Sequence, residues 1–136
     1  EGEILKTGRF QKLALANPKL APYGVAAMET LQSLSLTEQL KSKFVQGENI
    51  SQAYQFVETE NAQIGFVAMS QVFSEGKLLK GSAWIVPTQL YSPIQQDAIL
   101  LVAGQKNSAA IALMRYLKTD KAKSVMRAYG YSHPTQ

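Results

Sequence analysis

The chain of 136 residues has no cysteine, one tryptophan and one histidine. Without cysteine, disulfide bonds and thiolate-ligated metals are excluded, but the redox compartment stays open because an oxidising compartment permits disulfides without requiring them. No apolar run reaches the roughly 18 residues that a membrane-spanning helix needs, and no signal-peptide pattern is present. The sequence alone therefore argues against a membrane span and leaves export undetermined.

Residues that commonly carry catalysis or bind metals are few and scattered. The single histidine, His133, lies in a Pro-containing tail with no cysteine and no paired acidic residue nearby, so no Ser-His-Asp or Cys-His arrangement is predicted. Glu58 and Glu60 cannot share a helix face at a separation of two. No cluster of His, Cys or Asp has metal-ligand spacing. We predict that the protein is not an enzyme and holds no metal or cofactor.

Positive charge is in modest excess, with 14 Lys and Arg against 10 Asp and Glu and a formal net charge of +4. The basic residues are dispersed over what are predicted to be helix ends and faces. No basic stripe with interleaved aromatics accompanies them, which disfavours nucleic-acid binding. The charge predicts only a weak attraction for anions.

Short apolar runs alternate with helical patterns along the chain. The apolar runs predict strands at 12–16, 64–68, 83–86 and 98–102. The helical patterns predict helices at 22–33, 36–44, 50–59, 70–73, 108–118 and 121–129. Such alternation is typical of an α/β architecture with a largely parallel sheet.

Residues at the expected helix ends support several of these boundaries. Ser35 and Glu38 have the spacing of a capping box for the helix at 36–44. Asn49 is the expected cap of the helix at 50–59, and Asn107 or Ser108 that of the helix at 108–118. The last helix is expected to be capped by Asp120 and to end at Gly130 in the left-handed conformation.

The most informative segment is NPKLAPYGV at 17–25, which ends a strand and opens a helix. A helix N-terminus presents unpaired backbone N–H groups and a positive dipole end, which together bind anions without side-chain charge. Pro22 suits the first turn of a helix, and Gly24 allows close approach of the backbone. Taken alone, this loop is also typical of an ordinary turn into a helix, and Ile50 of a core residue.

Together with GENISQA at 47–53, IGFVA at 64–68 and MRAYGY at 126–131, this segment closely resembles the C-terminal part of periplasmic molybdate-binding proteins of ABC importers. The resemblance runs in register over nearly the whole chain. It implies a lobe of the type II periplasmic-binding-protein fold, with a mostly parallel sheet flanked by helices. It also implies that residues preceding Glu1 in such proteins supply part of the oxyanion shell, so this chain is expected to be a fragment.

The resemblance implies two oxyanion ligands in this chain, the main-chain N–H groups of Tyr23 and Ile50. Pro22, Gly24 and Asn49 would support them by setting the start of each helix. Because a molybdate or tungstate dianion has no proton to donate at neutral pH, a site built only from donors suits it. The oxyanion would be cargo, and no cofactor is implied.

Two positions bear on ligand choice. Some members of the family place an anion-binding tyrosine where this chain has Ala68, so that contact is not expected here. Glu48 lies beside the expected site, where a carboxylate would repel a dianion but accept a proton from hydrogen phosphate. Glu48 also suits a solvated residue that favours the helix dipole, and this simpler interpretation is preferred.

The resemblance divides the chain into residues 1–91, the second lobe, and residues 92–136, a strand and two helices that return toward the first lobe. Several apolar side chains of the return segment are therefore expected to be exposed. Fully burying such a side chain is worth about 1.5–3 kcal/mol, so we predict self-association or segment swapping if the chain folds alone. Lacking part of the oxyanion shell, the chain alone is expected to bind more weakly than micromolar.

The function implied is that of the periplasmic solute-binding component of a molybdate or tungstate importer, with the membrane permease as partner and no nucleic acid. Closure of two lobes around the anion would present a surface to the permease. Two alternatives stay open. One is a sulfate or phosphate importer component, and the other is an effector-binding regulatory domain of similar fold, which an attached DNA-binding segment would reveal.

Overall fold

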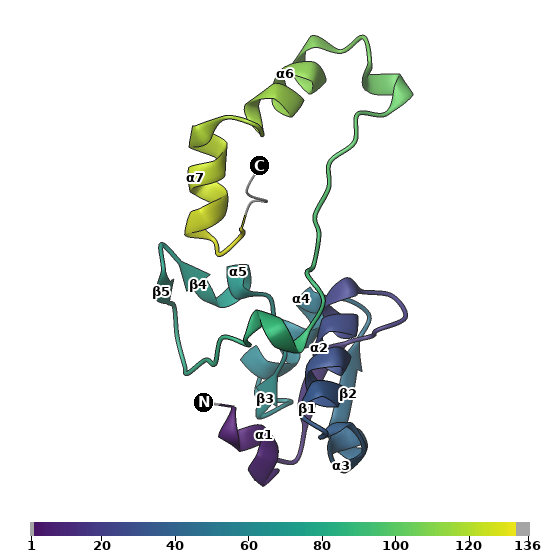
Figure 1. Cartoon of the computed structure of the whole chain (residues 1–136), viewed down its shortest axis with the longest axis vertical. Helices are drawn as coiled ribbons and strands as arrows, with labels where there is room; N and C mark the ends of the chain where they lie inside the picture. Colours follow the sequence, from purple (N-terminus) through teal and green to yellow (C-terminus); the bar gives the residue numbers. More distant parts are fainter. Residues whose placement is uncertain (1, 133–136) are drawn as a thin grey trace.

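The computed structural model describes residues 2–132. An extended segment joins a sheet-bearing part to a pair of C-terminal helices (Figure 1). The helices are α1 (Glu3–Thr7), α2 (Pro22–Ser33), α3 (Thr37–Leu40), α4 (Ile50–Glu58), α5 (Met69–Val72), α6 (Ser108–Tyr116) and α7 (Asp120–Ala128). The strands are β1 (Leu13–Ala16), β2 (Phe44–Gly47), β3 (Ile64–Gly65), β4 (Phe73–Ser74) and β5 (Lys77–Leu78). Three 3₁₀ turns complete the order: η1 (Lys41–Lys43), η2 (Thr88–Leu90) and η3 (Val102–Gly104).

The main sheet has three parallel strands in the order β2-β1-β3, with β1 in the centre. All four residues of β1 are buried. Because neighbouring residues of a strand face opposite sides, both faces of β1 must be covered. Helices α2 and α4 both contact β1 and provide this cover. The antiparallel β4 and β5 form a separate small hairpin.

The core lies between the sheet, α2 and the N-terminal helices. Leu13 and Leu15 of β1 pack with Leu31 of α2, and none of the three is more than 1% exposed. This cluster is completed by Leu5, Phe10, Ala27, Leu36 and Leu40. Within residues 2–91 the fold therefore has an apolar centre of its own.

The C-terminal part, residues 92–132, has almost no buried side chains. Beyond η2 the chain runs as an extended segment to η3 and then forms α6 and α7 (Figure 1). Ala122 is the one buried residue between 92 and 132. Large apolar side chains are exposed there, including Ile99 (81%), Leu101 (67%) and Val102 (80%). The expected exposure of apolar residues in this part is therefore observed.

Most of the predicted helices are present, but the one predicted at 36–44 is too long. It ends at Leu40 as α3, continues as η1, and Phe44 begins β2, a strand that the helical pattern concealed. The capping box is also wrong, because Leu36 is the N-cap residue and makes no side-chain cap bond. Ser35 has φ 58°, a left-handed conformation that ends the turn after α2 instead of opening a new helix.

Two predicted strands, at 83–86 and 98–102, are wrong, and a third is shorter than expected. The described residues contain no strand that pairs with either segment, and an apolar run without a partner cannot form a ladder. The strand predicted at 64–68 is β3 over two residues, although the Phe66 N–H still donates to the Ala14 carbonyl at 2.8 Å. Thr119, and not Asp120, caps α7, while Gly130 has the expected left-handed φ of 84°.

Candidate functional site

Two helix N-termini lie at one edge of the sheet. β1 ends at Ala16 and is followed by α2, and β2 ends at Gly47 and is followed by α4. Ala16 and Gly47 are paired in the parallel register, and the Asn17 N–H donates to the Gly47 carbonyl at 2.7 Å. Ligands of open α/β sheets bind at this carboxyl edge of the strands. The two predicted site segments are therefore neighbours in space.

At the start of α2, the backbone N–H of Tyr23 has no hydrogen-bond partner among the described residues. Ala21 is the N-cap residue and provides no side-chain cap, and Pro22 has no N–H. The Ala21 carbonyl accepts from Gly24 N at 2.9 Å and from Val25 N at 3.3 Å. Within residues 2–132, no protein acceptor lies within hydrogen-bond reach of the Tyr23 N–H. The predicted ligand atom is thus an unpaired donor on the first turn of a 12-residue helix.

The start of α4 has a similar donor at Ile50. Asn49 caps this helix as predicted, because its Oδ1 accepts from Gln52 N at 3.0 Å. The Gln52 Oε1 accepts in turn from Glu48 N at 2.7 Å. The Ile50 N–H itself has no protein acceptor in the described part of the chain. Asn49 and Gln52 therefore satisfy the N–H groups of Gln52 and Glu48 and leave that of Ile50 available to a ligand.

Glycine is required where each helix turns against its strand. A Cβ at Gly24 would collide with the Ala16 carbonyl oxygen and lie 2.7 Å from Pro18 N. A Cβ at Gly47 would lie 2.8 Å from Ala53 N. Atoms do not approach so closely without displacing the backbone, so these glycines fix how near the helix starts come to the sheet edge.

The two positions that bear on ligand choice differ in burial, since Ala68 is buried and Glu48 is exposed. Ala68 is 4% exposed, and its N–H donates to Gln71 Oε1 at 2.9 Å. Gln71 Nε2 also donates to the Ile50 carbonyl at 3.4 Å, so Gln71 ties the start of α5 to the start of α4. Sequence reasoning missed this residue, since an isolated glutamine has no recognisable pattern. Glu48 is exposed.

The Tyr23 side chain lies among other phenols. Burial raises the pKa of the Tyr23 phenol above its ordinary value of 10.0, and the neighbouring Tyr131 and then Tyr91 raise it further. Tyr131, just beyond α7, also places its hydroxyl 3.5 Å from the Ser70 hydroxyl. These contacts bring the end of the C-terminal part to the start of α2. No sequence signal pointed to Tyr131 as a neighbour of Tyr23.

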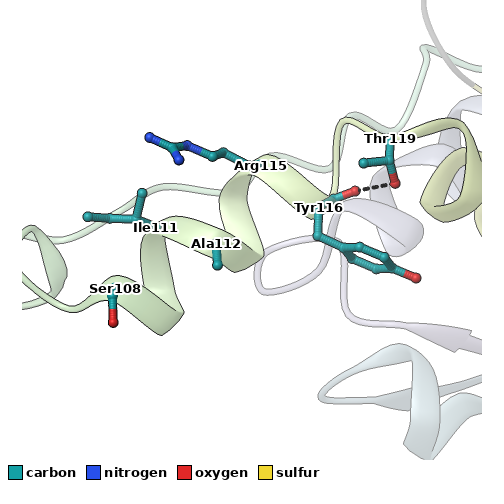
Figure 2. Close-up of a pocket in the computed structure, with 6 residues that line it drawn as sticks. All are labelled: Ser108, Ile111, Ala112, Arg115, Tyr116 and Thr119. Carbon is teal, nitrogen blue, oxygen red and sulfur yellow. Dashed lines mark hydrogen bonds between the residues drawn. The ribbon is translucent and has the colours of Figure 1, made fainter.

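Neither of two surface pockets is lined by Tyr23 or Ile50, although the second is lined by Pro22. The first, of about 500 Å³, lies along α6 and the turn that follows it (Figure 2). Its Thr119 hydroxyl already donates to the Tyr116 carbonyl at 2.7 Å and accepts from Ala122 N at 3.3 Å. The second, of about 400 Å³, lies between the loop that precedes α2 and residues 92–95. The predicted anion site is an open sheet edge and not a closed cavity.

Between residues 2 and 132, no three His, Cys, Asp or Glu residues come together in a way that could hold a metal ion. His133 lies outside the described residues. None of the described helices combines the length and apolarity that crossing a membrane requires.

The model of the family described as bacterial extracellular solute-binding protein matches residues 2–132. The chain belongs to this family. It is 56% identical over 131 residues to the molybdate-binding protein ModA of Azotobacter vinelandii and 50% identical over 132 residues to ModA of Rhodobacter capsulatus. These matches confirm the resemblance to molybdate-binding proteins that the sequence motifs indicated.

The fold of this chain is confirmed by a solved structure. A periplasmic molybdate-binding protein of Azotobacter vinelandii superposes with a TM-score of 0.91 at 31% identity, covering 98% of this chain and 59% of that protein. The curated relatives are also longer, since the chain spans 52% and 50% of the two ModA sequences. The chain therefore spans about half the length of the relatives that it matches.

Proposed function

We propose that this chain is part of the solute-binding component of a molybdate or tungstate ABC importer, and that it contributes the Tyr23 and Ile50 N–H groups to the oxyanion site. The observation that carries the proposal is the pair of unpaired N–H donors on neighbouring helix starts, in a chain 56% identical to a molybdate-binding protein. Both donors suit a fully deprotonated tetrahedral anion.

The supporting residues act through the backbone. Pro22 leaves the Tyr23 N–H as the first donor of α2, and Gly24 allows α2 to start against Ala16. Asn49 satisfies Gln52 N, so the Ile50 N–H stays free for the ligand. Because the contacts are main-chain contacts, the bulky Ile50 side chain does not conflict with a ligand role.

The division of the chain is part of the proposal. Residues 1–91 would form the second lobe, which holds the donors and the buried core. Residues 92–136 would belong with the first lobe, and the exposed Ile99, Leu101 and Val102 support this assignment. Closure of the two lobes would trap the anion and form the surface that the membrane permease recognises. No catalytic step and no cofactor enter this scheme.

The compartment is proposed on the same basis. The similar Azotobacter structure is described as periplasmic, and we assign this chain to the periplasm by that likeness.

Calorimetric titration of molybdate, tungstate, sulfate and phosphate into the protein at its natural length tests the function. We expect tight binding of molybdate and tungstate and much weaker binding of sulfate and phosphate. The 136-residue chain titrated in parallel is expected to bind more weakly than micromolar, since each hydrogen bond to a charged group is worth about 1.5–3 kcal/mol. Tight phosphate binding would contradict the choice of oxyanion, and no binding by the natural-length protein would contradict the function.

A further inference from the structure

The segment that leaves the sheet-bearing part runs alongside α2. Ser33, at the end of α2, donates its hydroxyl to the Leu90 carbonyl at 3.1 Å. One turn earlier, Glu29 accepts from both the backbone and the side chain of Ser92. One turn earlier again, Val25 lines a pocket together with Ile94. The chain from Leu90 to Ile94 therefore runs antiparallel to the helix, toward its N-terminus (Figure 1).

The spacing of these contacts is regular. Each step of four residues back along α2 covers about 6 Å, because a helix rises about 1.5 Å per residue. Each step of two residues along an extended chain covers about 6.6 Å. The hydrogen-bonded positions 33 and 29 of the helix thus match positions 90 and 92 of the segment, and Val25 and Ile94, which line the same pocket, continue this spacing. Pro93 favours this arrangement, since it disfavours the helical conformation at Ser92.

Glu29 makes the strongest of these contacts. Its Oε2 accepts from Ser92 N at 2.6 Å, and its Oε1 accepts from the Ser92 hydroxyl at 3.2 Å. Hydrogen bonds to an ionised group are shorter and roughly twice as strong as neutral ones. The carboxylate therefore holds one residue of the segment through two atoms, six positions along α2 from the Tyr23 donor.

We propose that Glu29 is a positioning residue of the oxyanion site, whose carboxylate keeps the 90–94 segment in register with the helix that presents the Tyr23 N–H. The direction in which the chain leaves for α6 and α7 is then set by the same rigid helix that binds the anion. This inference rests on the proposed function. It assigns Glu29 to the coupling between anion binding and lobe closure, and not to contact with the anion.

The two hydrogen bonds from Ser92 to Glu29 are called the clamp. Hydrogen exchange at the Ser92 amide tests the clamp without any ligand. Glu29→Ala removes the acceptor, and we expect the exchange of this amide to become about tenfold faster or more. Glu29→Gln keeps one carbonyl acceptor and should have a smaller effect. Ser92→Ala removes only the hydroxyl bond and should leave the exchange rate within about twofold of the unmodified protein. Unchanged exchange in Glu29→Ala would overturn the clamp.

Molybdate binding kinetics of the protein at its natural length test the positioning role. In Glu29→Ala we expect dissociation to become about tenfold faster while association changes by less than about twofold, because closure retains the anion after it has bound. Glu29→Gln should recover part of this loss. Glu38→Ala, at an exposed carboxylate of α3, is the matched control and should leave both rates unchanged.

The outcomes separate the two proposals. If the unmodified protein binds molybdate and Glu29→Ala releases it at the same rate, the positioning role is overturned and the function stands. A variant that is only less stable, with a lower denaturation midpoint but an unchanged dissociation rate, also overturns the positioning role. If the unmodified protein binds none of the four oxyanions, the proposed function is overturned, while hydrogen exchange at Ser92 still decides whether the clamp exists.

Discussion

Residues 2–91 and 92–132 are both rich in apolar side chains but place them in opposite ways. In the first region, Leu13, Leu15 and Leu31 are buried between β1 and α2. In the second region, Ile99, Leu101 and Val102 are largely exposed, and Ala122 alone is buried among residues 92–132. Apolar sequence therefore predicts burial only where other elements of the same region can cover it. The first region supplies cover for its central leucines, and the second region does not cover Ile99, Leu101 and Val102.

The largest difference between the regions should appear when one leucine is removed from each. Leu31→Ala leaves a cavity in a fully buried site and should lower the free energy of unfolding by about 2–5 kcal/mol. Leu101→Ala, at a side chain 67% exposed, should change it by no more than about 0.5 kcal/mol. Urea denaturation of both variants measures the two values. Equal losses would show that the regions share one core.

A smaller loss of stability, with a loss of function, is expected at the start of α2. Gly24→Ala forces a Cβ against the Ala16 carbonyl and should destabilise the protein by about 1–3 kcal/mol. It should also displace the Tyr23 N–H and weaken molybdate binding at least about tenfold in the natural-length protein. Titration calorimetry and denaturation measure the two effects. Gln32→Ala, at an exposed position near the end of the same helix, is the control and should preserve binding.

The two helix starts could be predicted from the sequence because their signals are local. The cap at Asn49, the proline at the start of α2 and the glycine at position 24 each act within a few residues, and each is found where expected. The ligand role of Tyr23 and Ile50 remains a prediction, which came from the combination of motifs and not from any one residue.

The errors in strand assignment and the missed contacts have a common physical cause, since they concern contacts between distant residues. The 98–102 run is as apolar as β1 but pairs with no strand of the described chain, and pairing depends on a partner that local sequence does not specify. Phe44 begins a strand because β1 lies beside it, although the local pattern is helical. The contacts of Glu29 with Ser92 and of Tyr131 with Tyr23 are likewise invisible to spacing rules.

The exposed surface of the second region predicts self-association of the 136-residue chain when it is expressed alone. Burying Ile99 and Leu101 against a second copy would gain about 1.5–3 kcal/mol for each side chain. Sedimentation velocity should therefore show oligomers at high concentration, and Ile99→Asp should shift the chain toward the monomer. Leu20→Asp, at a side chain 65% exposed in the first region, is the control and should not have this effect. A monodisperse monomer would contradict the prediction.

Each region has a helix capped by an asparagine side chain, Asn49 for α4 and Asn107 for α6. Asn49→Ala removes the acceptor for Gln52 N, and Asn107→Ala removes the acceptor for Ala109 N and Ala110 N at the start of α6. Each cap loss costs about 0.5–2 kcal/mol of helix stability. We expect only Asn49→Ala to weaken molybdate binding, because only α4 presents the Ile50 N–H. Circular dichroism and titration calorimetry separate the two effects, and an equal loss of affinity in both variants would contradict the site.

The smallest expected effect concerns the point where the end of the second region touches the first. The pKa of Tyr23 is raised by burial and by Tyr131, so Tyr131→Phe should move that pKa back toward 10.0 in an absorbance titration of the phenolate. A folded-state pKa above the unfolded value means that the associated stability is present below pH 10 and is lost as pH rises through the folded value. Tyr131→Phe should therefore lessen the alkaline loss of stability.

The control is Tyr54→Phe. The Tyr54 phenol donates to Glu58 at 3.1 Å within the first region, so this variant should leave the titration of Tyr23 unchanged. If Tyr131→Phe also left it unchanged, the two regions would not meet at Tyr23 in solution.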